Sequence, residues 1–68
     1  MITIAELRAR NNKMSQQKLA DEIGVGVDSV RRWEKDIYTI SAGNLKKLTS
    51  YFDVSADELL GTNKKISV

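Results

Sequence analysis

A helix-start pattern that recurs five times constrains this chain more than any other feature. In each case a residue suited to capping a helix follows an apolar residue, and a second apolar residue lies four positions after the cap, where the two can pack together. Proline is absent, and apolar residues recur at helical spacing. The caps are Thr3, Ser15, Gly26, Ser41 and Ser55. The pattern therefore predicts an all-α fold. Its helices cover about 4–12, 16–23, 27–35, 42–52 and 56–60.

Helical spacing assigns most of the apolar residues to one core. A chain of 68 residues holds one small domain, because domains run from about 50 to about 250 residues. We expect residues 1–61 to form a compact five-helix domain and residues 62–68 to be a polar tail. The predicted core residues are Leu7, Met14, Leu19, Ala20, Ile23, Val25, Val30, Trp33, Ile40, Leu45, Leu48, Phe52, Val54, Leu59 and Leu60.

Composition excludes several classes of function. The chain has no cysteine and no histidine, which removes thiolate chemistry, the commonest general base and the usual ligands of zinc. Glu34 and Asp36 lie two positions apart on a helix, so they do not face each other as a catalytic carboxylate pair would. We expect no enzyme activity, no metal site and no cofactor.

Charge and hydropathy limit the partners. Eleven Lys and Arg residues against nine Asp and Glu give a net charge of +2, which permits an anionic partner without requiring one. No apolar run approaches the roughly 18 residues of a membrane span, and the first residues lack the pattern of a signal peptide. We expect a cytoplasmic protein that does not bind membranes.

Residues 15–35 carry the most informative spacing. A short helix ends at Gly24 and a second begins within about three residues, which is the pattern of a helix-turn-helix unit. Ala20 provides a small side chain where the two helices would cross, and Trp33 has the helical phase of a core residue. In such a unit the second helix enters the DNA major groove while the first crosses the phosphate backbone.

Residues 4–60 resemble the Cro/repressor-type helix-turn-helix family (XRE family), which has a lambda-repressor-like fold of five helices. The stretches that carry the resemblance are SQQKLADEIGV, GVDSVRRWEK and ISAGNLKKLTSYFDVSADELLG. The resemblance implies a sequence-specific regulator of transcription that binds double-stranded DNA. For a free-standing chain of this length it implies a repressor of phage, prophage or mobile-element type, with no small-molecule effector.

The resemblance also assigns residues to two kinds of DNA contact. Bases would be read from the helix that follows the turn, where arginine suits guanine, aspartate suits the amino group of cytosine and valine suits the methyl group of thymine. The base-reading residues are Val27, Asp28, Ser29, Arg31 and Arg32. Phosphates suit the start of the preceding helix and the segment after the reading helix. The phosphate-contacting residues are Arg10, Gln16, Gln17, Lys35, Tyr38, Thr39 and Asn44.

Three assignments stay open at this point. Asp28 could contact a base or only cap the helix that follows the turn, and Arg31 and Arg32 could form a solvated face near acidic residues. The NNKMS junction is one residue longer than the family pattern. It therefore leaves open whether Arg8 or Arg10 is the family's arginine that pairs with Glu34, and we favour Arg10 slightly.

One helix-turn-helix unit covers only half of an operator. Specific binding normally needs two units on a pseudo-palindrome whose half-sites lie about 10 base pairs apart. We therefore expect a homodimer, at least on DNA, formed through Leu60, Ile66, Val68 and their neighbours. The alternative is a protein-interaction module such as an antitoxin or anti-repressor, which salt-dependent binding to random DNA would distinguish. The operator sequence, the choice between repression and activation, and the oligomeric state in solution stay open.

Overall fold

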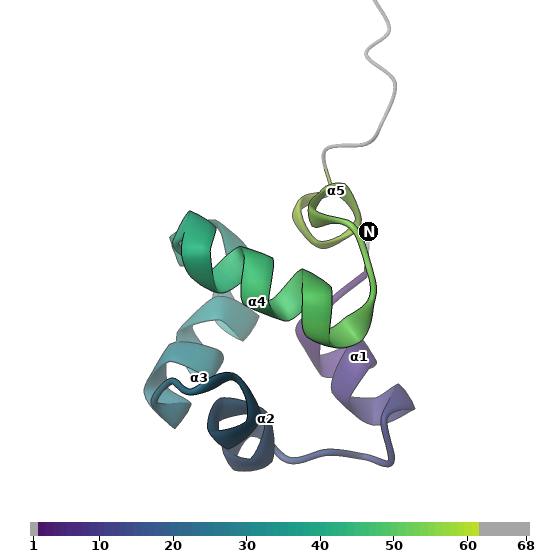
Figure 1. The fold of residues 1–68 in the computed structure, drawn as a ribbon, viewed down its shortest axis with the longest axis vertical. Coiled ribbons are helices and arrows are strands. Elements are labelled where there is room, and N and C mark those ends of the chain that lie inside the picture. Colours follow the sequence, from purple (N-terminus) through teal and green to yellow (C-terminus); the bar gives the residue numbers. More distant parts are fainter. Residues whose placement is uncertain (1, 62–68) are drawn as a thin grey trace, which may run out of the picture.

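Five α-helices and one short 3-10 helix make up residues 2–61, the part of the chain that the computed structural model describes (Figure 1). These residues contain no strand, so the all-α prediction is confirmed. The elements are α1 (Ile4–Arg10), α2 (Gln16–Ile23), α3 (Val27–Lys35), η1 (Ile37–Thr39), α4 (Ala42–Phe52) and α5 (Ala56–Leu60). Figure 1 shows α4 with α3 near its first end and α1 near its last end, while α5 follows on the side away from α2.

Side-chain caps start four of the five α-helices, as the sequence pattern predicts. The hydroxyl oxygens of Thr3, Ser15, Ser41 and Ser55 each accept a hydrogen bond from the backbone N–H three residues later, at 3.0–3.2 Å. At Thr3 and Ser55 a glutamate side chain also accepts from the N–H of the cap, which completes a capping box. The fifth cap, Gly26, has no side chain to contribute.

The first helix ends at Arg10, two residues earlier than the predicted end at 12. Asn12 and Lys13 have φ values of 58° and 56°, in the left-handed region, and two such residues in succession cannot continue a right-handed helix. The N–H of Met14 donates to the carbonyl of Arg8 at 3.0 Å. The junction is therefore a tight turn that folds back onto α1.

The 3-10 helix η1 has no counterpart in the prediction. It begins where the Asp36 carboxylate accepts from the N–H of Tyr38 at 3.1 Å, and it turns Ile37 into the core. Three residues are too few to show a hydrophobic period, so the sequence pattern gave no sign of this element.

The core agrees with the predicted set and adds two residues, Ile4 and Ile37, at the first positions of α1 and η1. The remaining buried residues are Leu7, Leu19, Ala20, Ile23, Val30, Trp33, Leu48 and Leu59. The other predicted core residues are partly buried and pack against this cluster; they are Met14, Val25, Ile40, Leu45, Phe52, Val54 and Leu60.

Ala20 gives a direct test of the helix packing because its side chain is fully buried. The Ala20→Leu substitution should lower the free energy of unfolding by roughly 1–3 kcal/mol, since three added carbon atoms must displace close-packed neighbours. Ala5→Leu adds the same atoms at an exposed position of α1 and should change stability little. Urea titrations followed by circular dichroism would compare them, and equal midpoints would contradict the buried crossing.

Candidate nucleic-acid interface

The turn between α2 and α3 has the geometry of a helix-turn-helix unit. Gly24 ends α2 in a left-handed conformation with φ of 76°, which glycine adopts without strain. The N–H groups of Gly24 and Val25 both donate to the carbonyl of Ala20, each at 2.9 Å. Val25 packs against the core, and α3 begins at Val27. α2 and α3 therefore pack against each other, and a short turn tied to the Ala20 carbonyl connects them.

One side of α3 is buried and the opposite side is exposed. Val30 and Trp33 are buried, so the prediction that Trp33 packs in the core is confirmed. The exposed residues are Asp28, Arg31, Arg32 and Lys35, which follow one another at intervals of three, one and three positions and so share one side of the helix. We call these four residues the α3 face.

Val27 and Ser29 lie at the margins of the α3 face. Both are half-buried, and Val27 packs against the core. Successive residues turn about 100° around a helix, so Val27 and Arg32 point about 140° apart. The structure therefore places Arg32 with Asp28 but not with Val27, and any base contact by Val27 would be made from the edge of the helix.

Asp28 and Arg31 form an ion pair on the α3 face. Nη1 of Arg31 donates to Oδ1 of Asp28 at 3.3 Å, with side chains 61% and 89% exposed. No side chain caps the start of α3, so the alternative role of Asp28 as a second cap is not what the structure shows. Within residues 2–61, Arg32 forms no ion pair and projects from the same face without a restraining partner.

Arg8, and not Arg10, pairs with Glu34, so the slight preference for Arg10 was wrong. Nε of Arg8 donates to Oε2 of Glu34 at 2.7 Å, and Nη2 donates to Oε1 at 3.0 Å. The third nitrogen, Nη1, donates to the carbonyl of Met14 at 2.9 Å. The two side chains are only 19% and 15% exposed. This fork joins α1, the α1–α2 junction and α3.

The position of Arg10 follows from its place on α1. Residues two positions apart point about 160° apart around a helix, so Arg10 is directed away from Glu34 when Arg8 faces it. Arg10 is exposed and lines a shallow hollow with Leu7, Tyr51 and Phe52. The structure therefore does not bring Arg10 together with the start of α2 or with the α3 face.

The first residue of α2 is tied to the same acid. Nε2 of Gln16 donates to Oε1 of Glu34 at 3.0 Å, which fixes the start of α2 against α3. Gln17 is exposed, and its amide donates to Asp21 at 3.0 Å. Of these two predicted phosphate contacts, Gln16 is held in place by the protein and Gln17 lies on the surface.

A second ion pair on α2 is exposed and local. Nζ of Lys18 lies 3.0 Å from Oε2 of Glu22, one turn along the helix. The hydrogen bond that the Lys18 ammonium donates to Glu22, together with the charge of Glu22, raises the pKa of Lys18. Because both groups are accessible to water, this pair provides a useful contrast to the enclosed Arg8–Glu34 pair.

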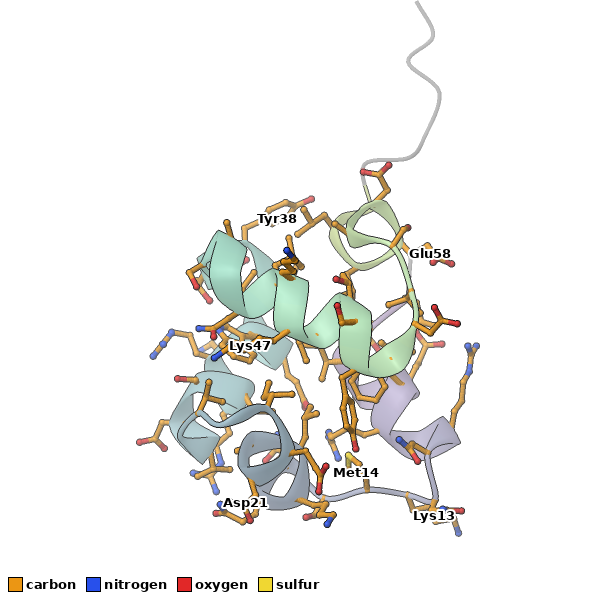
Figure 2. The ribbon with its side chains drawn as sticks, viewed as in Figure 1. Lys13, Met14, Asp21, Tyr38, Lys47 and Glu58 are labelled. Carbon is orange, nitrogen blue, oxygen red and sulfur yellow. The ribbon has the colours of Figure 1, made fainter. Side chains whose placement is uncertain are left out.

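The remaining predicted phosphate contacts lie after α3. Lys35 and Thr39 are exposed and Asn44 is half-buried at the start of α4. Tyr38 has a ring that is 64% exposed, but its hydroxyl donates to the carbonyl of Leu60 in α5. Figure 2 shows Tyr38 beside α5 and at the opposite end of the molecule from Asp21 in α2. The structure therefore separates Tyr38 from the start of the helix-turn-helix unit.

Residues 2–61 contain no group of three or more acidic, histidine or cysteine side chains placed to hold a metal ion. None of their helices is long and apolar enough to cross a membrane.

Comparisons with known proteins agree with this geometry. The profile of a protein family described as "Helix-turn-helix" matches residues 4–59, which extend from the start of α1 into α5. Searches of curated proteins and of solved structures gave no match.

Proposed function

Since the chain belongs to the helix-turn-helix family of the Cro/repressor (XRE) type, we propose that it is a sequence-specific DNA-binding regulator of transcription. The observation that carries this proposal is the α3 face. Three cations and one carboxylate stand on the exposed side of a helix whose other side is held by Val30 and Trp33. A rigid helix with mobile charged and hydrogen-bonding side chains suits the major groove.

In this proposal Arg31 and Arg32 read base edges, Asp28 lies beside them on the same face, and Val27 and Ser29 contact DNA from the margins of α3. Arginine can donate two hydrogen bonds to one guanine, which makes it the commonest reader of a specific base. Lys35 stands at the end of the same face, where a flexible ammonium suits the phosphate backbone.

Gln16 and Gln17 would approach a phosphate at the start of α2, and Thr39 and Asn44 would approach another beyond α3. We assign Arg8 a supporting role, because all three of its guanidinium nitrogens already donate to protein oxygens. Through Glu34, which also accepts from Gln16, Arg8 holds the start of α2 in register with α3. Arg10 and Tyr38 are the weakest of the predicted contacts, since each lies on another side of the fold.

We further propose that the protein represses transcription as a homodimer on a pseudo-palindromic operator, in the manner of phage and mobile-element switch proteins. Leu60 is half-buried and lies at the end of α5, where a partner could cover it. Ile66 and Val68, the other predicted interface residues, lie outside the residues that the structure describes.

Selection of bound sites from random duplex DNA tests this function. We expect two inverted half-sites about 10 base pairs apart between centres, because each α3 would enter the major groove on the same side of the duplex. Binding to one isolated half-site should be much weaker and less cooperative than binding to the pair. Equal binding to both DNAs would remove the dimer from the proposal. Failure to bind any DNA in a salt-dependent way would favour the interaction module, an antitoxin or anti-repressor.

A further inference from the structure

The α3 face contains one acidic residue among three cations, and this residue makes no capping hydrogen bond at the start of the helix. No side chain caps α3, and the Asp28 carboxylate instead accepts from Nη1 of Arg31 at 3.3 Å. We propose that Asp28 is a positioning residue that orients Arg31 to read one base pair and, by its charge, weakens binding to non-cognate DNA. This inference rests on the proposed function and names the source of its specificity.

The ion pair between Asp28 and Arg31 leaves one edge of the Arg31 guanidinium free to bind a base. A guanidinium presents five N–H donors in a fixed planar fork. Asp28 takes a donor on Nη1, so Nε and Nη2, which lie along another edge of the plane, stay available. That edge matches the O6 and N7 acceptors of guanine in the major groove. Asp28 can therefore hold Arg31 without competing for the atoms that would bind the base.

The contrast with Arg32 shows what the pairing changes. Both arginines are on the α3 face, but of the two only Arg31 has an ionic partner within the described residues. A free arginine loses rotamer entropy when it binds, whereas a side chain already held near its bound orientation loses less. Arg32 can turn to a base or to a phosphate. Arg31 is biased toward one direction, which favours discrimination between bases.

The charge of Asp28 acts on all DNA sequences. Binding without sequence preference depends almost entirely on neutralising phosphates with cations. The Asp28 carboxylate is 89% exposed at the first end of the α3 face, and it repels the phosphates of any DNA that this face contacts. On the operator, the contact between the ordered Arg31 and its base offsets this repulsion. On random DNA that contact is absent and the repulsion remains. The pair therefore increases the ratio of operator affinity to random affinity.

The Asp28→Asn substitution tests the inference, because it removes the charge and keeps the shape of the side chain. Compared with wild type, affinity for random duplex DNA should rise roughly threefold or more, and the ratio of operator to random affinity should fall by about tenfold. The matched control is Asp53→Asn, which removes the same charge at the end of α4. Asp53 has φ of 57°, a conformation that asparagine tolerates well, and this change should leave the ratio unaltered.

Site selection with Arg31→Ala and with the double variant decides whether Asp28 acts through Arg31. We expect Asp28→Asn and Arg31→Ala each to relax the preference at the same base pair. The double variant should show no more relaxation there than Arg31→Ala alone. Relaxation of a different base pair would show that Asp28 reads a base itself and would overturn the positioning role. An unchanged affinity ratio in a folded Asp28→Asn protein would overturn the inference as a whole. Wild-type protein that selects no sequence at all would instead refute the proposed function.

Discussion

Replacing Glu34 with glutamine should lower the free energy of unfolding by about 2–3 kcal/mol, because the change leaves the Arg8 guanidinium without an anion in an enclosed site. Removing one partner of a fully buried ion pair costs roughly 3–5 kcal/mol, and the 15–19% exposure of these side chains reduces that figure. The glutamine amide would also direct N–H donors toward Arg8 or Gln16, which are donors themselves. A domain of this size has only about 3–10 kcal/mol of stability in total.

Glu22→Gln is the matched control for this experiment. It makes the same chemical change in the exposed Lys18–Glu22 pair, where loss of the interaction should cost less than about 1 kcal/mol. Urea titration of the wild type and the two variants, followed by the circular dichroism of their helices, would measure both differences in the free energy of unfolding. Equal effects of the two substitutions would show that the Arg8–Glu34 pair is no more than a surface contact.

The sequence predicts the helix-turn-helix unit well because its determinants are local. Ser15 caps α2 by accepting from the N–H of Lys18, three residues away, and the turn depends on Ala20 and Gly24, four positions apart. Because these determinants lie within a few residues of one another, the sequence alone reveals them. This is why the bounds of α2 to α5 and the inward direction of Trp33 agree with the structure.

The sequence predicts the partner of Glu34 less well, because that pairing depends on how the α1–α2 junction folds. Asn12 and Lys13 both adopt left-handed conformations, and a polar run gives no periodic signal for this. The turn returns Met14 to Arg8, whose guanidinium binds the Met14 carbonyl and Glu34 together. The choice between Arg8 and Arg10 is thus decided by the backbone geometry of residues 11–13, which are all polar.

The residues of the α3 face could be predicted as a set, but not their relation to one another. Helical spacing places Asp28, Arg31, Arg32 and Lys35 on one side once the buried side is known. Spacing alone did not decide whether Asp28 caps the helix or pairs with Arg31. Because that choice depends on side-chain conformation, it required the structure.

Arg32→Ala and Lys35→Ala should weaken DNA binding in different ways, although both remove one exposed cation from the α3 face. Arg32 lies in the middle of the reading surface, so its loss should cost roughly 1–3 kcal/mol on the operator and relax preference at one base pair. Its effect on random duplex DNA should be smaller. Lys35 lies at the last position of α3, so its loss should weaken operator and random DNA about equally.

Salt dependence separates the two roles. A lost phosphate contact reduces the slope of log affinity against log salt concentration by about one unit, and we expect this for Lys35→Ala on both DNAs. Binding titrations of both variants at several salt concentrations would measure the slopes and the ratio of operator to random affinity. If Arg32→Ala lowers both affinities equally and reduces the slope as Lys35→Ala does, then Arg32 binds phosphate. Sequence reading would then have to come from Arg31 and the margins of α3.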